Sequence, residues 1–182
     1  MSEDPATLNK QAISAAKRHM GPVALLTIIL TFGVITGFVL NLWLFATGVM
    51  SAWAAFIILG ALTYLAYTPL HEAVHGNING EHERLKWVND LCGYLVAPLI
   101  AIPYTSHRVE HFTHHRYTNQ PDKDPDYMVS EMGKGAVTAL LTVIRFLWVQ
   151  NTFFVSQYWS SASFRERVTY SLEVLVSLGW RV

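Results

Sequence analysis

The chain has 182 residues, of which 52% are hydrophobic and only 14% are charged, and its formal net charge is zero. Typical soluble domains carry about 25% charged residues, so the composition argues against an ordinary soluble domain. The zero net charge offers no basic surface for nucleic acid, so we expect no nucleic-acid partner. The single cysteine, Cys92, excludes an internal disulfide and is predicted to be a small core thiol.

The first 20 residues are polar and mixed in charge, and the apolar stretch behind them is too long for the h-region of a signal peptide. We interpret residues 1–20 as a cytoplasmic leader with a helix over Ala6–Arg18. Lys10 and Lys17 also precede the first apolar segment, so the positive-inside rule predicts that the N-terminus is cytoplasmic.

No Asp, Glu, Lys or Arg occurs between Arg18 and Glu72. A transmembrane helix needs about 20 mostly apolar residues, so this interval holds two predicted spans, at about Pro22–Phe45 and Ala52–Leu70. Two crossings return the chain to the cytoplasmic side at His71. The predicted fold class is therefore an all-α integral membrane protein, with a transmembrane helical hairpin followed by cytoplasmic-face helices that carry histidines.

Three further apolar segments follow. The run Leu91–Tyr104 is too short to span a bilayer and is predicted to be interfacial or re-entrant. Arg145 and Gln150 interrupt the apolar face of the predicted helix at Gly135–Tyr158, which favours an amphipathic helix along the membrane over a true span. The stretch "VTYSLEVLVSLGWRV" begins another apolar helix but is short for a span.

Histidines are grouped at helical spacing in two places. His71 and His75 are four residues apart, and offsets of four, seven and eight place a second set on one helix face. A row of imidazoles is costly unless something shares the lone pairs, and a metal ion does that. His19 and His82 are interpreted as ordinary interfacial or solvated side chains. The second set is His107, His111, His114 and His115.

The motif His-Glu-x-x-His has two interpretations. It is typical of zinc proteases, with Glu72 as the general base. A catalytic zinc takes three protein ligands, however, and this chain offers five or six histidines. Two irons with open positions for dioxygen would use that many, because imidazole also suits iron. Carboxylates that orient the rings are then expected, and the candidates are Glu72, Asp90, Glu110, Asp124 and Asp126.

"HEAVHG" followed by "HFTHHRYTNQPDKDPDY" resembles the first two histidine boxes of the membrane fatty acid desaturases and their hydroxylase and carotenoid-modifying relatives. The similarity is close over about Ala52–Tyr127, and residues 21–182 are interpreted as the N-terminal part of a desaturase-like membrane domain. His107 has no counterpart in the family pattern and is left open as an extra ligand, a supporting group or a bystander. The resemblance implies a di-iron centre at the cytoplasmic face, with the ligands His71, His75, His111, His114 and His115.

The same resemblance implies a function. We expect an oxygen-dependent di-iron oxidoreductase that desaturates a fatty acyl chain or hydroxylates a lipid- or carotenoid-like substrate, with dioxygen as co-substrate. No flavin, nicotinamide or haem motif is present, so electrons are expected from an external ferredoxin- or cytochrome-type donor. The alternatives are an intramembrane zinc metalloprotease and an inactive metal-binding membrane fragment. The family's third box, HxxHH, does not follow His115, so we expect a fragment that is inactive alone.

Overall fold

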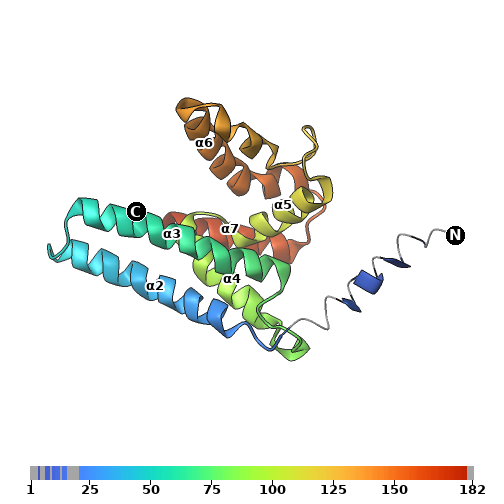
Figure 1. Ribbon diagram of the computed structural model, residues 1–182, viewed down its shortest axis with the longest axis horizontal. Coiled ribbons are helices and arrows are strands. Elements are labelled where there is room, and N and C mark those ends of the chain that lie inside the picture. The colour runs from blue at the N-terminus through green and yellow to red at the C-terminus, as the bar shows by residue number, and fades with distance from the viewer. Residues whose placement is uncertain (1–3, 5–6, 9, 13, 16–20, 180–182) are drawn as a thin grey trace.

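The computed structural model describes residues 4, 7–8, 10–12, 14–15 and 21–179, and the regular structure among them is entirely helical (Figure 1). Within the predicted leader helix, residues 7–8, 10–12 and 14–15 are helical, while the rest of that range and His19 lie outside the described residues. The elements are α2 (Leu25–Ala46), α3 (Ala52–His75), η1 (Glu83–Leu85), α4 (Trp87–Ile100), α5 (Tyr104–Tyr117), η2 (Tyr127–Lys134), α6 (Ala136–Phe153), the π-helical turn η3 (Phe154–Tyr158) and α7 (Phe164–Gly179).

The predicted hairpin is present as α2 and α3, which run antiparallel and side by side (Figure 1). They contain 22 and 24 residues, or about 33 and 36 Å of helix, and both are long and apolar enough to cross a membrane. The second helix does not end at the predicted boundary, Leu70. It continues through the buried Pro69 to His75, so its last turn carries the first histidine pair.

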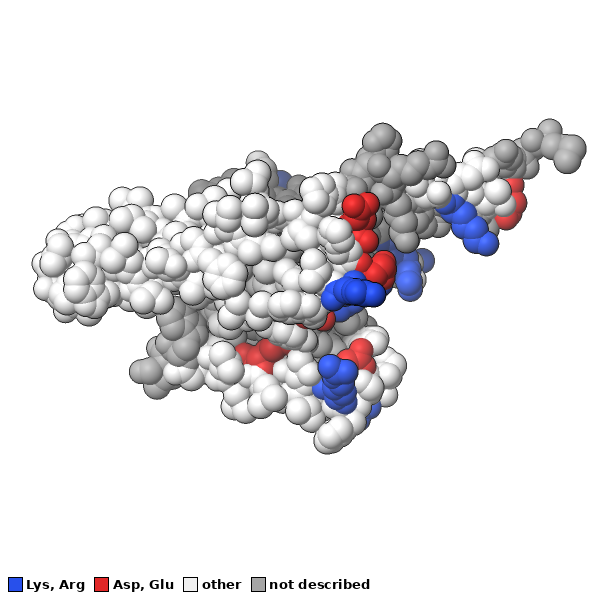
Figure 2. Space-filling view, turned by 90° about the horizontal axis from the view of Figure 1, so that it is seen from below, with Lys and Arg blue, Asp and Glu red and all other residues white. Residues whose placement is uncertain are grey.

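The hairpin exposes apolar side chains over most of its surface. Leu26, Phe56 and Tyr64 are 83%, 69% and 82% exposed, as expected of helices that face lipid. Figure 2 shows that Lys, Arg, Asp and Glu gather at the end of the molecule away from the α2–α3 turn. Inside the hairpin, the buried Asn41 donates a hydrogen bond to the Ala55 carbonyl across 3.3 Å, a polar link between apolar helices.

The helices α4 and α5 meet at a bend of 99° and contain 14 residues each. A pair bent this sharply is a broken span or a re-entrant loop. Neither helix alone has the about 20 residues that a span requires, and the interfacial or re-entrant segment stays a prediction. The α4 helix packs against the hairpin around Leu70, Val74 and Val96, and the buried Cys92 belongs to this core, as predicted.

The helix predicted at Gly135–Tyr158 is present as a third long apolar helix, formed by α6 and η3, and its orientation along the membrane stays a prediction. From Ala136 to Tyr158 it has 23 residues and meets the length and hydropathy of a span. Gln150, which appeared to interrupt its apolar face, and the adjacent Asn151 both form hydrogen bonds inside the protein. Gln150 is fully buried against α5, and the Asn151 amide donates to the Ala101 carbonyl across 2.9 Å.

The π-helical turn η3 follows directly, and hydrogen bonds from neighbouring helices stabilise the backbone around it. The Ser106 hydroxyl donates to the Gln150 carbonyl across 2.6 Å, and the Tyr170 hydroxyl donates to the Asn151 carbonyl. The rings of Phe154 and Tyr170 stack with centroids 4.7 Å apart. Carbonyls at the irregular end of α6 are therefore satisfied by side chains of α5 and α7.

Candidate metal centre

The first histidine pair is placed by the regular helix α3. His71 and His75 lie one turn apart with ring centroids at 4.6 Å, and both side chains are partly buried. The helix ends immediately afterwards at Gly76, whose φ of 69° is the left-handed conformation that glycine adopts without strain. The two rings therefore project from the last turn of α3, which Gly76 terminates.

The second set lies on α5, whose first turn is fixed by other helices. The Tyr104 hydroxyl donates to the Ala73 carbonyl across 3.1 Å, which joins the start of α5 to α3 between the two histidines of the first pair. The Thr105 backbone N–H donates to the Glu173 carboxylate across 3.0 Å, and the Thr105 hydroxyl donates to it as well. These bonds set the position of α5 beside the end of α3.

Four of the predicted ligands converge. Each of them offers one ring nitrogen, and these atoms all lie within 4.8 Å of one another. The Nε2 atom of His111 lies 2.9 Å from that of His75 and 3.0 Å from that of His115, and the last two are 3.3 Å apart. Nitrogens that bind one ion at about 2.1 Å lie about 3 to 3.5 Å apart, so the spacing fits one metal ion. The four residues are His71, His75, His111 and His115.

His114, the fifth predicted ligand, lies beside this group. Its ring centroid is 6.1 Å from that of His111 and 5.7 Å from that of His115. Its Nδ1 atom lies 2.7 Å from a carboxylate oxygen of Asp124. An Nδ1–H that donates to a carboxylate leaves a lone pair on Nε2, which is the form of histidine that binds metal.

The two aspartates of the loop after α5 differ in their electrostatics. Burial alone would raise the pKa of Asp124, but hydrogen bonds from His114 and from two backbone N–H groups outweigh burial and lower it. Burial, followed by the negative charge of Glu110, raises the pKa of Asp126 to about 7. The ionised Asp124 therefore holds the His114 ring, while Asp126, 3.9 Å from the same ring nitrogen, is the more readily protonated of the two.

His107 does not join the four converging histidines. It is fully buried, and its Nδ1 atom lies 2.7 Å from the Gln150 side-chain oxygen and 3.4 Å from the Glu110 carboxylate. Its ring contacts those of Tyr67 and His111, with centroids 5.7 and 5.2 Å away. His107 therefore connects α5 to α6 through Gln150, next to the cluster.

Two of the other candidate carboxylates, Glu72 and Asp90, contact different groups. The Glu72 carboxylate lies 3.3 Å from His71 Nδ1 and also accepts a hydrogen bond from Asn77. Asp90, which was expected near the histidines, instead accepts a hydrogen bond from Tyr104 and lies 3.6 Å from Arg108. Glu72 can therefore orient a ring of the cluster, whereas Asp90 stabilises the start of α5.

Sequence reasoning did not identify Tyr104, Gln150 and Glu173, the side chains that hold α5 in place. No motif marks them, and Gln150 was interpreted as a break in an apolar face. One signal was present, because a polar residue in a long apolar segment requires a hydrogen-bond partner. His82, by contrast, is exposed, as the interpretation of a solvated side chain predicted.

Comparison with known proteins gives a consistent set of matches. A family model described as "Fatty acid desaturase" matches residues 47–182. A beta-carotene ketolase of Haematococcus lacustris is 36% identical over 75 residues, which cover 41% of this chain and 22% of that protein. An sn-1 acyl-lipid omega-3 desaturase (ferredoxin) of Nostoc sp. (strain 36) is 33% identical over 73 residues, covering 40% and 19%.

A third relative, an sn-1 oleoyl-lipid 12-desaturase of Anabaena variabilis, is 27% identical over 118 residues, which cover 65% of this chain and 31% of that protein. The chain thus spans less than a third of the length of each of these relatives. No solved structure matches the chain.

Proposed function

Because the chain belongs to the fatty acid desaturase family, we propose that it forms part of a di-iron, oxygen-dependent membrane oxidoreductase of lipid metabolism. Its reaction is the desaturation of a fatty acyl chain or the hydroxylation of a lipid- or carotenoid-like substrate. The observation that carries this proposal is the convergence of four histidine nitrogens from the ends of α3 and α5. A di-iron centre, when bound, supplies the activation of dioxygen that an unreactive C–H bond requires.

The chain's own residues would hold and orient the metal ligands. The Nε2 atoms of His75, His111 and His115 fit one iron by their spacing, and His71 offers a nitrogen within 4.8 Å of them. The Asp124 carboxylate orients the His114 ring beside this group. Among the described residues, no other histidine belongs to the converging group. His107 instead contacts the Gln150 side chain. We therefore expect the 182-residue chain to bind iron but not to turn over substrate by itself.

The relatives favour a long apolar substrate and an external reductant. Their names include acyl-lipid and carotene substrates and, in one case, ferredoxin. Removing two hydrogens from a substrate while reducing dioxygen to two waters consumes two further electrons and two protons. A ferredoxin- or cytochrome-type donor would supply those electrons, because the sequence carries no flavin, nicotinamide or haem motif.

The zinc protease alternative is not favoured by the geometry. In that reaction Glu72 would act as a base on metal-bound water, but its carboxylate is engaged by His71 and Asn77. The protease motif also uses only the first histidine pair, whereas the structure brings His111 and His115 into the same group. The comparisons give no support to a protease.

Metal analysis tests the proposal directly. The chain, purified in detergent and loaded anaerobically with Fe(II), should retain iron, and the triple variant His75→Ala, His111→Ala, His115→Ala should lose it. The exposed His82→Ala is the matched control and should retain iron. Stoichiometric zinc that survives the triple replacement would refute the iron centre.

A further inference from the structure

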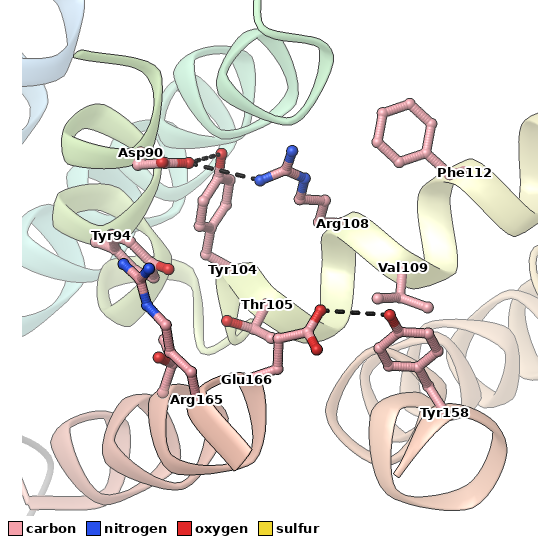
Figure 3. Close-up of a pocket in the computed structure, with 11 residues that line it drawn as sticks. Asp90, Tyr94, Tyr104, Thr105, Arg108, Val109, Phe112, Tyr158, Arg165 and Glu166 are labelled. Atoms are coloured by element: carbon pink, nitrogen blue, oxygen red, sulfur yellow. Dashed lines mark hydrogen bonds and ion pairs between the residues drawn. The ribbon is translucent and has the colours of Figure 1, made fainter. Parts of the chain in front are cut away.

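A polar cavity of about 490 Å³ lies on the side of α5 adjacent to its histidines, between α4, α5 and the start of α7 (Figure 3). Arg108 from α5 and Arg165 from α7 line it, together with the hydroxyl-bearing Tyr94, Tyr158 and Thr169. In Figure 3 the Arg108 guanidinium points toward Asp90, whereas the Arg165 guanidinium lies apart from it, in the direction of Tyr94. This cavity is separate from the four converging histidines, none of which lines it.

The acidic groups of the cavity are already engaged. Asp90 lies 3.6 Å from Arg108 and accepts a hydrogen bond from Tyr104. Glu166 accepts hydrogen bonds from the Ser163 backbone N–H and hydroxyl, at 2.8 and 2.6 Å, and from Tyr158. Glu166 thus completes a capping box at the start of α7.

Arg165 is different. It is exposed, and among the residues that the structure describes no carboxylate lies within ion-pair distance of it and no hydrogen-bond acceptor is assigned to it. The cavity therefore offers, at Arg165, a guanidinium group whose charge no described carboxylate offsets, together with several hydroxyls. Guanidinium groups bind phosphate through paired N–H donors, so this charge is complementary to a phosphate.

An apolar cavity of about 310 Å³ continues the polar one along α7, and Tyr94 and Thr169 line both. Its walls include Pro98, Leu172 and Val176, and Leu172 and Val176 are each 55% exposed. The carboxylate of Glu173, which also lines this cavity, is directed to Thr105. From Arg165 to Val176 the groove therefore changes from cationic to apolar over about 16 Å of helix.

We propose that this groove binds one phosphate-bearing membrane lipid, with the phosphate at Arg165 and an acyl chain along Leu172 and Val176. A phosphate with an attached hydrocarbon chain matches both ends of the groove at once, and such molecules surround a chain with this many apolar, exposed helices. The site requires neither metal nor turnover, so it is independent of the proposed function.

Equilibrium binding of spin-labelled phosphatidylglycerol to the purified 182-residue chain tests this site. Two competitors separate the contributions: a diacylglycerol with the same chains, which lacks phosphate, and glycerol phosphate, which lacks chains. The lipid should bind at least about tenfold more tightly than either competitor, which corresponds to about 1.4 kcal/mol. Equal competition by the diacylglycerol would overturn the phosphate site, and equal competition by glycerol phosphate would overturn the lipid.

Two matched pairs of variants locate the site. Arg165→Gln should weaken binding about tenfold, or about 1.4 kcal/mol, while Arg145→Gln on the exposed surface of α6 should not change it. Val176→Trp should block the apolar end, whereas Leu175→Trp, one residue away and not in the groove, should not. Helical content by circular dichroism and elution as a single species confirm that each variant folds. Folded Arg165→Gln and Val176→Trp variants that bind like their controls would refute the proposal.

Discussion

The two helices that bring histidines together are built in different ways. The α3 helix has 24 residues, and its own ends are capped by the Ser51 hydroxyl and by Gly76. The α5 helix has 14 residues and no side-chain N-cap of its own. It is held at Tyr104 by α3, at Thr105 by α7, at His107 by α6 and at His114 by the following loop.

This difference determines where the metal geometry is vulnerable. On α3 the spacing of His71 and His75 follows from the helix itself, so distant changes should leave it intact. On α5 the same spacing is local, but its position beside α3 depends on residues as far along the chain as Gln150 and Glu173. The support of the second histidine set should therefore be the more sensitive to mutation.

The largest effect is expected at Asp126, on the α5 side. Burial and the charge of Glu110 raise its folded pKa to about 7, above about 3.9 in the unfolded chain. The folded metal-free chain then binds more protons than the unfolded chain between about pH 4 and 7, so this group makes stability fall as pH rises through that window. Asp126→Asn should stabilise the metal-free chain by about 2–4 kcal/mol at pH 8 and change little near pH 4.

Denaturation of both chains at several pH values measures this effect. All other titratable groups are the same in both chains, so the difference in stability between variant and parent isolates Asp126. A difference that is the same at pH 4 and pH 8 would show that the carboxyl is not protonated in the fold.

The next effect is expected at Gln150. Gln150→Leu removes the acceptor for the fully buried His107 ring and should destabilise the chain by about 1–3 kcal/mol. Gln157→Leu, at an exposed site in η3, is the control and should leave stability nearly unchanged. Chemical denaturation measures the stability of both variants. A Gln150→Leu variant as stable as its control would show that α5 does not depend on its contact with Gln150.

A smaller and more selective effect is expected at Asp124. Asp124→Asn replaces the carboxylate that fixes the His114 ring, and losses of this kind typically weaken metal affinity 10–100-fold. Asp122→Asn changes an exposed carboxylate two residues away in the same loop, so iron affinity should be retained. Iron titration compares the two, and similar affinities would show that His114 needs no support from Asp124.

The smallest effect is expected on α3. Ser51→Ala removes the N-cap hydrogen bond to Ala54 and should cost about 1 kcal/mol of stability. The histidines lie at the other end of the helix, so iron affinity should not change. A loss of iron in this variant would show that the histidine pair on α3 also depends on distant residues, as the set on α5 is expected to do.

The hairpin and the histidine spacing could be predicted from sequence because both are local patterns. The uncharged interval from Arg18 to Glu72 and the offsets within each histidine set depend only on positions along the chain. The attachment of α5 depends on pairs such as Thr105–Glu173 and His107–Gln150, which are far apart in sequence. A single sequence can indicate that Gln150 needs a hydrogen-bond partner, but it does not show which residue that partner is.

The burial of polar side chains on α6 escaped prediction for the same reason. Gln150 and Asn151 are polar residues at positions that a surface helix would turn toward water, and the sequence does not show their partners on α5 and in the turn before it. Burial of a polar side chain is visible only once the neighbouring helix is in place.

The π-helical turn η3 makes the protein sensitive to chain length as well as to side-chain chemistry. A π-helical turn holds about one residue more than an α-helical turn, because its hydrogen bonds run from i to i+5. Deletion of one residue from Phe154–Tyr158 would favour an ordinary α-helical turn there and would shorten the connection to α7 by one residue. The pairs Tyr158–Glu166 and Phe154–Tyr170 bridge this connection, so both contacts would be displaced. Substitutions in this turn change one side chain at a time, whereas the loss or gain of a single codon would change how α7 packs against α5, the helix that carries the second histidine set.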